Sequence, residues 1–232
     1  MDSMGTITNH YYPYHDTQGA KIATKTRYTK LKEFSIQGNT KDSGLFGQHL
    51  FSKNKYCIIT EGELDALSAY QMMLKGTYHT PVVSIKNGIS SAVKDIKNSL
   101  EWLENNFDNV IVNFDNDEHG IDGAMKVAEL FSPGKCKIMH LPEGFKDASD
   151  CLTKNKIQIY NKTFWDAKVF APDGIINANT LLDDVLKPIT KSFVQYPFEG
   201  LNKITYGLRP SELVTFTAGS GLGKTQVMRE VV

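Results

Sequence analysis

Acidic residues follow an apolar run in the stretch IITEGELDALSAY, where Glu61 ends the run and Asp65 lies one helical turn beyond it. The arrangement recurs in VIVNFDNDEHG, with Asp115 and Asp117, and in EGFKDASD, with Asp147. Carboxylates gathered in one place raise one another's pKa unless a cation compensates their charge. Mg²⁺ suits this task, because it takes one or two carboxylates and completes its shell with water and substrate phosphate. The residues therefore predict a divalent-metal site that handles phosphate groups.

Each acid taken alone has a simpler interpretation. Glu61, Glu63 and Asp65 favour the N-terminus of a helix through its dipole, and an Asp-Asn-Asp run is typical of a turn. The recurrence of acids after successive apolar runs favours the metal site.

The elements expected to position these acids alternate between strands and helices. We expect strands at 56–60, 80–85, 109–114 and 136–141, and helices near 63–75, 90–105 and 121–131. Short apolar strands alternating with amphipathic helices indicate an α/β fold, a mainly parallel sheet with helices on its faces. Ligands of such sheets bind outside the carboxyl ends of the strands, which is where the acids fall. Before this region, strands joined by a turn at DTQGA predict a small β-rich N-terminal part.

Composition is that of a globular protein, with 232 residues, 41% of them hydrophobic and 22% charged. No run of 18 apolar residues and no signal peptide is recognised, so we expect a cytoplasmic protein without a membrane partner. Cys57, Cys136 and Cys151 form no disulfide framework and no C-x-x-C pair, and we expect no zinc site.

The net charge of zero argues against indiscriminate binding of nucleic acid, but the charge is unevenly distributed. Residues 1–60 contain eight Lys or Arg against four acids, and KIATKTRYTKLK contains no acid. Such a run is often a solvated face. The interleaved aromatics Tyr28 and Phe34 instead suit bases stacked beside phosphates.

The motifs TEGELDALSAY and VNFDNDEHG together resemble the Toprim domain. The longer series YYPYHDTQGAKIATKTR, SGLFGQHLF, TEGELDAL, VVSIKNG, NFDNDEHG, KDASDC and PDG resembles the bifunctional DNA primase-helicases of short-tailed bacteriophages, and more distantly the mitochondrial helicase Twinkle. This resemblance covers nearly the whole chain. It implies synthesis of an RNA primer from ribonucleotides on a single-stranded DNA template, in the cytoplasm of an infected bacterium.

The resemblance also implies roles for the acids, in a two-metal phosphoryl transfer with Mg²⁺ or Mn²⁺. Asp115 and Asp117 are then the principal metal ligands, and Asp147 completes or supports the site. Glu61 is either a ligand or the general base that takes the proton of the primer 3′-hydroxyl. Asp65 is a residue that orients the others.

Other residues are implied to contact the nucleotide or the template. Lys25 and Arg27 match a basic strand that faces phosphates in the family, and the role extends more weakly to Lys30 and Lys32. Asn87 and Gly88, after the second strand of the sheet, are expected to approach the nucleotide.

The stretch LVTFTAGSGLGKT is typical of a strand leading into a phosphate-binding loop, with Ala218 where the strict pattern has glycine. Backbone N–H groups of such a loop hold phosphates, lysine reaches the β and γ oxygens, and the threonine hydroxyl binds Mg²⁺. We expect ATP binding in the full-length protein but no ATP hydrolysis by this chain, for want of the remaining helicase elements. The residues of the loop are Gly219, Gly221, Gly223, Lys224 and Thr225.

Four parts are expected along the chain: a β-rich primase subdomain at 1–52, a Toprim domain at 53–168, a linker at 169–190 and the start of a RecA-like domain at 191–232. The linker contains a predicted helix, NTLLDDVLK, that in the family assembles a hexameric or heptameric ring; packing within its own chain is the alternative. The full-length protein is expected to meet the replisome DNA polymerase. This chain, without a zinc ribbon or most of the helicase domain, is expected to be monomeric and to lose site-specific initiation.

Three other functions stay open. In the first, the Toprim domain is catalytically silent and serves DNA binding and ring assembly, as the Twinkle-like branch suggests, although the retained acids argue against decay. In the second, the protein is a nuclease or topoisomerase, because these enzymes use similar acids. In the third, it is a phosphotransferase that acts on no nucleic acid, which would leave the basic strand unexplained.

Overall fold

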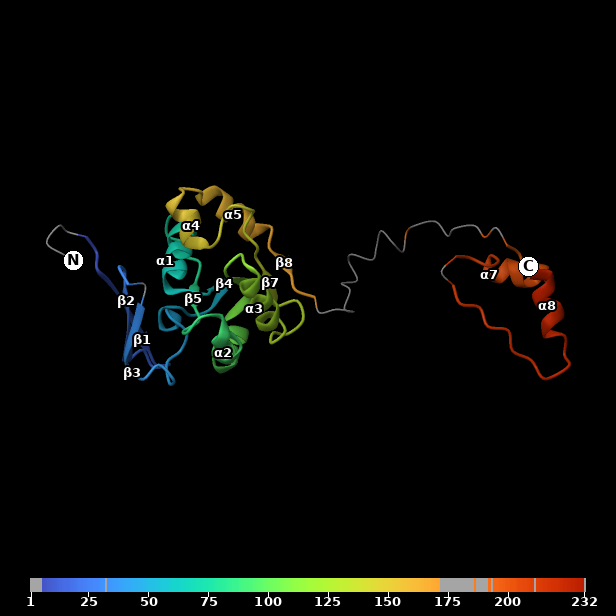
Figure 1. Ribbon diagram of the computed structural model, residues 1–232, viewed down its shortest axis with the longest axis horizontal. Helices are drawn as coiled ribbons and strands as arrows, with labels where there is room; N and C mark the ends of the chain where they lie inside the picture. Colours follow the sequence, from blue (N-terminus) through green and yellow to red (C-terminus); the bar gives the residue numbers. More distant parts are fainter. Residues whose placement is uncertain are drawn as a thin grey trace. The chain divides into compact units, whose positions relative to one another are not determined.

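The computed structural model describes residues 6–31, 33–171, 186, 192, 194–210 and 212–231. Contacts divide the chain into two units, Met1–Ile175 and Ile176–Val232, and each is described by itself (Figure 1). The finer division into four parts stays a prediction.

An antiparallel sheet in the order β1-β2-β3 opens the first unit. It consists of β1 (Asn9–His15), β2 (Lys21–Tyr28) and β3 (Glu33–Gly38). The turn between β1 and β2 forms because Asp16 Oδ1 accepts hydrogen bonds from the backbone N–H groups of Gln18 and Ala20, while Gly19 adopts a φ of 84°. The predicted β-rich N-terminal part and its turn at DTQGA are confirmed.

A second sheet has the order β5-β4-β6-β7-β8. Its first four strands are parallel, and β8 runs antiparallel to β7. This confirms the predicted α/β fold; β8, two residues long, was not predicted. The strands are β4 (Asn54–Thr60), β5 (Val82–Ser84), β6 (Phe107–Asn113), β7 (Cys136–Ile138) and β8 (Lys168–Val169).

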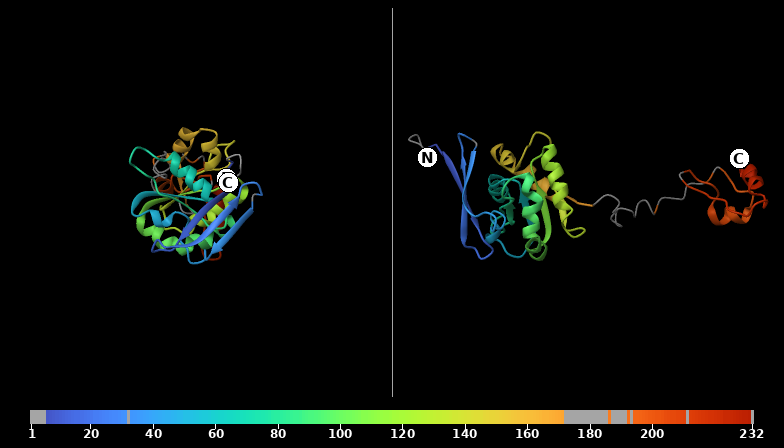
Figure 2. Two further views of the ribbon diagram at one scale, coloured as in Figure 1. Left: turned by 90° about the vertical axis from the view of Figure 1, so that its left-hand side faces the viewer. Right: turned by 60° about the horizontal axis from the view of Figure 1, so that its bottom comes forward.

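Helices cover both faces of this sheet (Figures 1 and 2). One face carries α1 (Glu63–Met72), α4 (Ala148–Thr153) and α5 (Ile157–Trp165), and the other carries α2 (Ala92–Asn106) and α3 (Glu118–Ala128). Strand β4 shows why both faces must be covered: Cys57 and Ile59 pack with α2 and α3, whereas Ile58 packs with α1. Helices α1, α2 and α3 were predicted, whereas α4 and α5 were not.

The N-terminal sheet packs against the α/β core, as Figure 2 shows. Tyr12 and Tyr14 of β1 contact Phe46, which forms a two-way backbone bridge with Ser84 of β5. Buried Lys86 adds a polar connection, because its Nζ donates to the backbone oxygens of the loop at 40–43. The first unit thus places a basic sheet beside the carboxyl edge of the parallel sheet.

The second unit contains α7 (Glu199–Thr205), α8 (Lys224–Val231) and an isolated bridge between Val194 and Leu208. The predicted strand before the glycine-rich loop is wrong for the described part, since residues 212–219 have no strand structure. A strand requires a hydrogen-bonded neighbour, and the described residues of this unit offer none there. The predicted linker helix lies outside the described residues, apart from exposed Leu186. Among the residues described, no helix is long and apolar enough to cross a membrane.

Candidate active site

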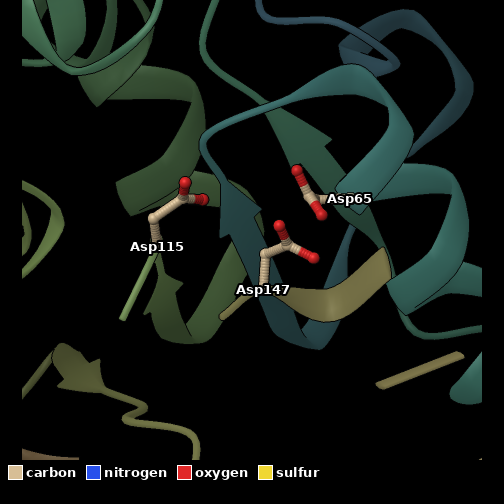
Figure 3. A group of neighbouring side chains, drawn as sticks. All are labelled: Asp65, Asp115 and Asp147. Atoms are coloured by element: carbon tan, nitrogen blue, oxygen red, sulfur yellow. The ribbon is translucent and has the colours of Figure 1, made fainter. Parts of the chain in front are cut away.

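Acidic side chains from three elements meet at the carboxyl edge of the parallel sheet. Asp65 lies in the first turn of α1, Asp115 two residues after β6, and Asp147 at the N-cap of α4. One carboxylate oxygen from each lies within 4.8 Å of the other two. Figure 3 shows the three carboxyl groups gathered from separate parts of the ribbon. We call these residues the acid trio.

Backbone hydrogen bonds hold the acid trio in place. The N–H of Ser149 donates to Asp65 Oδ1 at 3.0 Å, and the N–H of Asp150 donates to Asp147 Oδ1 at 2.7 Å. Each bond satisfies a free donor at the start of α4. The helix terminus therefore helps to keep two carboxylates close together.

Asn116 ties the loop of Asp115 to the loop of Asp147. Its backbone N–H donates to the Lys146 oxygen at 2.8 Å, and its side chain donates to the Leu141 and Phe145 oxygens. The distance between the two acid loops thus depends on an amide that carries no charge.

Two glycines make close approaches within the site. A Cβ at Gly120 would lie 2.0 Å from the backbone oxygen of Asp115, and a Cβ at Gly62 would lie 2.8 Å from Asp65 Oδ2. The first contact is with backbone and admits only glycine, whereas a Cβ at Gly62 would displace the Asp65 carboxylate. The glycines of TEGE and DEHG are therefore part of the geometry of the acids.

Mutual repulsion and burial shape the titration of the acids. Burial, followed by the charge of Asp147, raises the pKa of Asp65 to about 7. Burial and then the charge of Asp115 also raise the pKa of Glu61, although a hydrogen bond from the Ile89 backbone opposes this. These carboxylates are costly to ionise without a cation beside them.

The donor set of the acid trio fits a hard divalent cation. Carboxylate oxygens are the preferred ligands of Mg²⁺ and Mn²⁺, and the spacing of the three oxygens permits a shared ion. Lys146 supplies one cation already: its Nζ lies 3.0 Å from Asp115 Oδ2, and this hydrogen bond raises the pKa of Lys146.

The acid trio lines an open cleft of about 480 Å³ between the parallel sheet and the N-terminal sheet. Glu61 lines the same cleft on the acidic side. Asn87 and Gly88 belong to its rim, where Gly88 adopts a φ of 72° and lies next to Glu61. Across from them, the basic strand β2 contributes Lys25 and Arg27.

The structure separates some of the residues grouped by sequence. Asp117 is exposed and caps α3, accepting from the N–H of Gly120 at 2.9 Å; it does not line the cleft. Lys30 is exposed in the turn after β2 and also lies outside the cleft lining. Lys32 lies outside the described residues. The roles assigned to all three stay predictions.

Lys25 is held by the protein itself. Its Nζ lies 2.8 Å from Glu63 Oε1 and donates to the Lys86 oxygen at 2.9 Å. The same Glu63 oxygen accepts a 2.6 Å hydrogen bond from the Tyr14 hydroxyl. The charge of Lys25 therefore serves largely to fasten β2 to α1. Of Lys25 and Arg27, Arg27 is the more available to a ligand.

Lys146, Asn116 and Glu63 were missed as site residues by sequence reasoning. Lys146 directly precedes Asp147, and the alternation of Lys and Asp in FKDASD is the signal that points to it. Asn116 has no comparable signal, because its role depends on which loop lies beside it.

The glycine-rich loop of the second unit differs from a preformed phosphate site. Gly221 and Gly223 have φ values near +80°, and α8 begins at Lys224, as the motif predicts. The Lys224 Nζ, however, donates to the loop's own carbonyl oxygens at Ala218 (2.6 Å) and Gly219 (2.9 Å). Gly219 and Thr225 are exposed with the rest of the loop. ATP binding there stays a prediction.

Known proteins are similar to this chain in sequence and in structure. Residues 58–152 match the family described as Toprim-like. The chain is 34% identical over 221 residues to a DNA helicase/primase of Enterobacteria phage T3, an alignment that covers 94% of this chain and 38% of that protein. The chain thus spans less than half the length of that relative.

Two solved structures are also similar. One shows the bacteriophage T7 lagging-strand DNA polymerase interacting with primase domains bound to an RNA/DNA hybrid and dTTP; its TM-score is 0.62 at 29% identity, covering 70% of this chain and 79% of that chain. The other is the primase fragment of the bacteriophage T7 primase-helicase, with a TM-score of 0.61 at 30% identity, covering 68% and 62% respectively.

Proposed function

We propose, on the premise that this chain is a relative of the phage primase-helicases and carries a Toprim-like domain, that it synthesises RNA primers on single-stranded DNA. The observation that carries the proposal is the cleft: the acid trio forms one wall and a basic sheet the other. An acidic wall alone would suit many reactions. The opposing wall, with Arg27 beside Lys25, favours a substrate with phosphates.

The acid trio is proposed to hold the metal, with Asp65 a ligand beside Asp115 and Asp147, rather than an orienting residue alone. Metal ions bound there supply charge that stabilises the attacking and leaving oxygens of phosphoryl transfer. Glu61, whose raised pKa suits proton transfer, either joins the ligands or accepts the proton of the primer 3′-hydroxyl.

Cations of the cleft are proposed to bind the nucleotide phosphates. Arg27 offers a fork of donors that matches a phosphate, and Lys146, exposed and paired with Asp115, neutralises charge near the reacting groups. Asn87 and Gly88 present a polar rim and a backbone next to Glu61 that a nucleotide can approach.

The relatives support the partners expected from sequence. Primase domains of phage T7 are bound to an RNA/DNA hybrid and interact with a DNA polymerase. We propose template DNA, an RNA primer and ribonucleotides as ligands of this chain. In a longer protein, we propose ATP at the glycine-rich loop, a ring assembly and contact with the replisome polymerase.

The test is synthesis of labelled oligoribonucleotides on single-stranded templates with Mg²⁺ or Mn²⁺. Asp115→Asn and Asp147→Asn should each lower the rate at least 100-fold, about the size of losing a charged group that acts in the transition state. Asp122→Asn is the matched control, because Asp122 is an exposed acid paired with Lys126 on the outer turn of α3. Asp117→Asn measures whether the predicted ligand role of Asp117 holds.

Three outcomes would contradict the proposal in different ways. Primer synthesis that survives Asp115→Asn places the chemistry elsewhere. Metal-dependent cleavage of the template instead of synthesis indicates a nuclease. Binding of single strands without any product, even when a zinc ribbon is supplied in trans, indicates a silent binding module.

A further inference from the structure

Two large apolar side chains on strand β3 are exposed at the cleft. Phe34 is 52% exposed and Ile36 is 46% exposed, and both line the cleft that contains the acid trio. Every residue of β3 is exposed, and β3 is an edge strand. Apolar side chains on an exposed edge strand favour aggregation, and where a protein keeps them they often mark a binding site. Their position opposite the acids calls for a ligand with an apolar part.

Strand register places Phe34 and Ile36 on the same face of the sheet as the cations of β2. Phe34 lies directly opposite Arg27, and Ile36 directly opposite Lys25. Because side chains alternate between the faces of a strand, Ser35 points to the other face, where its hydroxyl contacts that of Tyr28 at 3.2 Å. Of the two aromatics among the cations, Phe34 therefore belongs to the cleft.

The Phe34 ring is supported by both cations of β2. Lys25 Nζ lies 4.8 Å from the ring centroid and the Arg27 guanidinium carbon 5.8 Å from it, within the range of cation–π attraction. Lys25 is itself fixed by Glu63. The ring is thus held on a fixed support while half of its surface stays free for contact.

The two walls of the cleft match the two parts of a nucleotide. The acids and Lys146 suit a metal-bound phosphate group, and the apolar pair suits a planar base. Aromatic side chains bind bases by stacking, which contributes about 1–3 kcal/mol per base and tolerates any sequence. Arg27, beside the ring, is placed to meet the phosphate of the same nucleotide.

We propose that Phe34, flanked by Ile36, is the platform on which a nucleobase stacks during primer synthesis. The inference rests on the proposed function and adds a positioning residue that neither the acid motifs nor the basic run identifies. The base belongs either to the template strand or to the incoming ribonucleotide, and both present the same planar surface.

The test uses 2-aminopurine, whose fluorescence falls when the base stacks. One arm places it in a single-stranded template and the other supplies it as the ribonucleoside triphosphate, each with Mg²⁺. We expect wild type and Phe34→Trp to quench one of the two probes. Phe34→Ala and Phe34→Leu should remove the quenching and raise the Kd or KM of that ligand on the order of 5- to 100-fold.

Matched controls separate stacking from damage to the sheet. Tyr11→Ala removes an aromatic side chain that is 64% exposed on β1, at the other edge of the same sheet, and does not line the cleft; it should leave the quenching intact. Phe34→Leu keeps an apolar side chain without a ring, so its loss of quenching assigns the effect to stacking.

Each outcome bears on the inference. Quenching of the template probe assigns the platform to the template, and quenching of the triphosphate assigns it to the incoming nucleotide. Quenching that persists in Phe34→Ala, or its absence from both arms, overturns the inference. The two proposals fail in different ways: stacking of a probe by wild type that makes no primer contradicts the proposed function, and primer synthesis by wild type that stacks neither probe contradicts the platform. Both arms are repeated with Asp115→Asn to separate base stacking from catalysis by the acid trio.

Discussion

The cleft of the acid trio and the glycine-rich loop at 219–225 are both predicted from sequence to bind phosphate groups, but the structure positions their residues to different degrees. In the cleft, backbone donors, Asn116 and two glycines fix the acidic side chains, and a second sheet closes the other side. In the loop, Lys224 bonds the carbonyl oxygens of its own backbone, and the residues before it form no strand.

The difference teaches that a motif becomes a site through its neighbours. Side chains of like charge come together in the cleft because folding of a five-stranded sheet compensates the cost of their repulsion. The described part of the loop's unit contains two helices and an isolated bridge, so little packing fixes the loop.

Glycine substitutions should show the contrast most strongly. Gly120→Ala places a Cβ 2.0 Å from the Asp115 backbone oxygen, which forces the loop of Asp115 or α3 to move. We expect the free energy of unfolding to fall by more than about 3 kcal/mol and primer synthesis to be lost. Gly221→Ala, with φ +79° and no atom within 4 Å of the new Cβ, should cost about 1 kcal/mol of local strain. Chemical denaturation followed by circular dichroism measures both, and equal effects would contradict the contrast.

Ion pairs offer the next largest difference. Lys86, 5% exposed, pairs with buried Asp95 at 3.7 Å and holds the loop at 40–43. Lys86→Met leaves Asp95 without its cation, so we expect a loss of about 3–5 kcal/mol in urea unfolding. The exposed pair of Lys203 and Glu199 in the second unit is the control, and Lys203→Met should have no measurable effect. An unchanged urea midpoint for Lys86→Met would show that the N-terminal sheet is held by its apolar contacts alone.

A smaller effect is expected from the titration of Asp65. Because its pKa is raised from 3.8 to about 7 on folding, the folded state binds the proton more tightly, and stability falls as pH rises from about 4 to about 7. Asp65→Asn keeps an acceptor for the Ser149 N–H and removes the charge. In chelator, we expect its Tm to exceed that of wild type by several degrees at pH 8 and to match it near pH 4.

If Asp65 is a metal ligand, added metal should reverse the order of the two Tm values at pH 8, so that wild type becomes the more stable protein. Added Mg²⁺ should raise the Tm of wild type at pH 8 and leave that of Asp65→Asn nearly unchanged. A Tm of Asp65→Asn below that of wild type in chelator at pH 8 would refute the proposed repulsion.

The smallest effect belongs to Lys224 of the glycine-rich loop. Lys224→Ala should leave primer synthesis within about two-fold of wild type, because Lys224 is an exposed residue of the second unit and does not line the cleft. The oligoribonucleotide assay measures this, with Asp115→Asn as the reference for a large loss. A large loss in Lys224→Ala would show that the two motifs act together.

Much of the fold was predictable because its signals are local. The apolar run before Glu61 indicated β4, the helical stretch after it indicated α1, and Gly19 within DTQGA indicated the first hairpin. Helices α4 and α5 escaped prediction, since α4 is six residues long and its boundaries depend on Asp147 as a cap. The strand before the glycine-rich loop was predicted from apolar residues alone, yet pairing decides whether such residues form a strand.

The candidate site shows the same division. Sequence singled out Glu61, Asp115 and Asp147, because acids that end parallel strands meet at one edge. It placed Asp65 in a supporting role and Asp117 in a leading one, whereas the structure brings Asp65 into the acid trio and turns Asp117 to cap α3. The spacing of Asp-x-Asp cannot tell which carboxylate bonds its own helix.

The sequence by itself determined which chemical groups are present and the order of strands and helices, since hydrophobic period, glycine and acid positions act over a few residues. Tertiary structure alone decided which carboxylates lie close together, that Lys25 forms an ion pair with Glu63, and that Phe34 lines the same cleft as the acids. The reason is that distances between side chains from different elements depend on sheet order, register and loop packing, and these come from interactions among residues far apart in the chain.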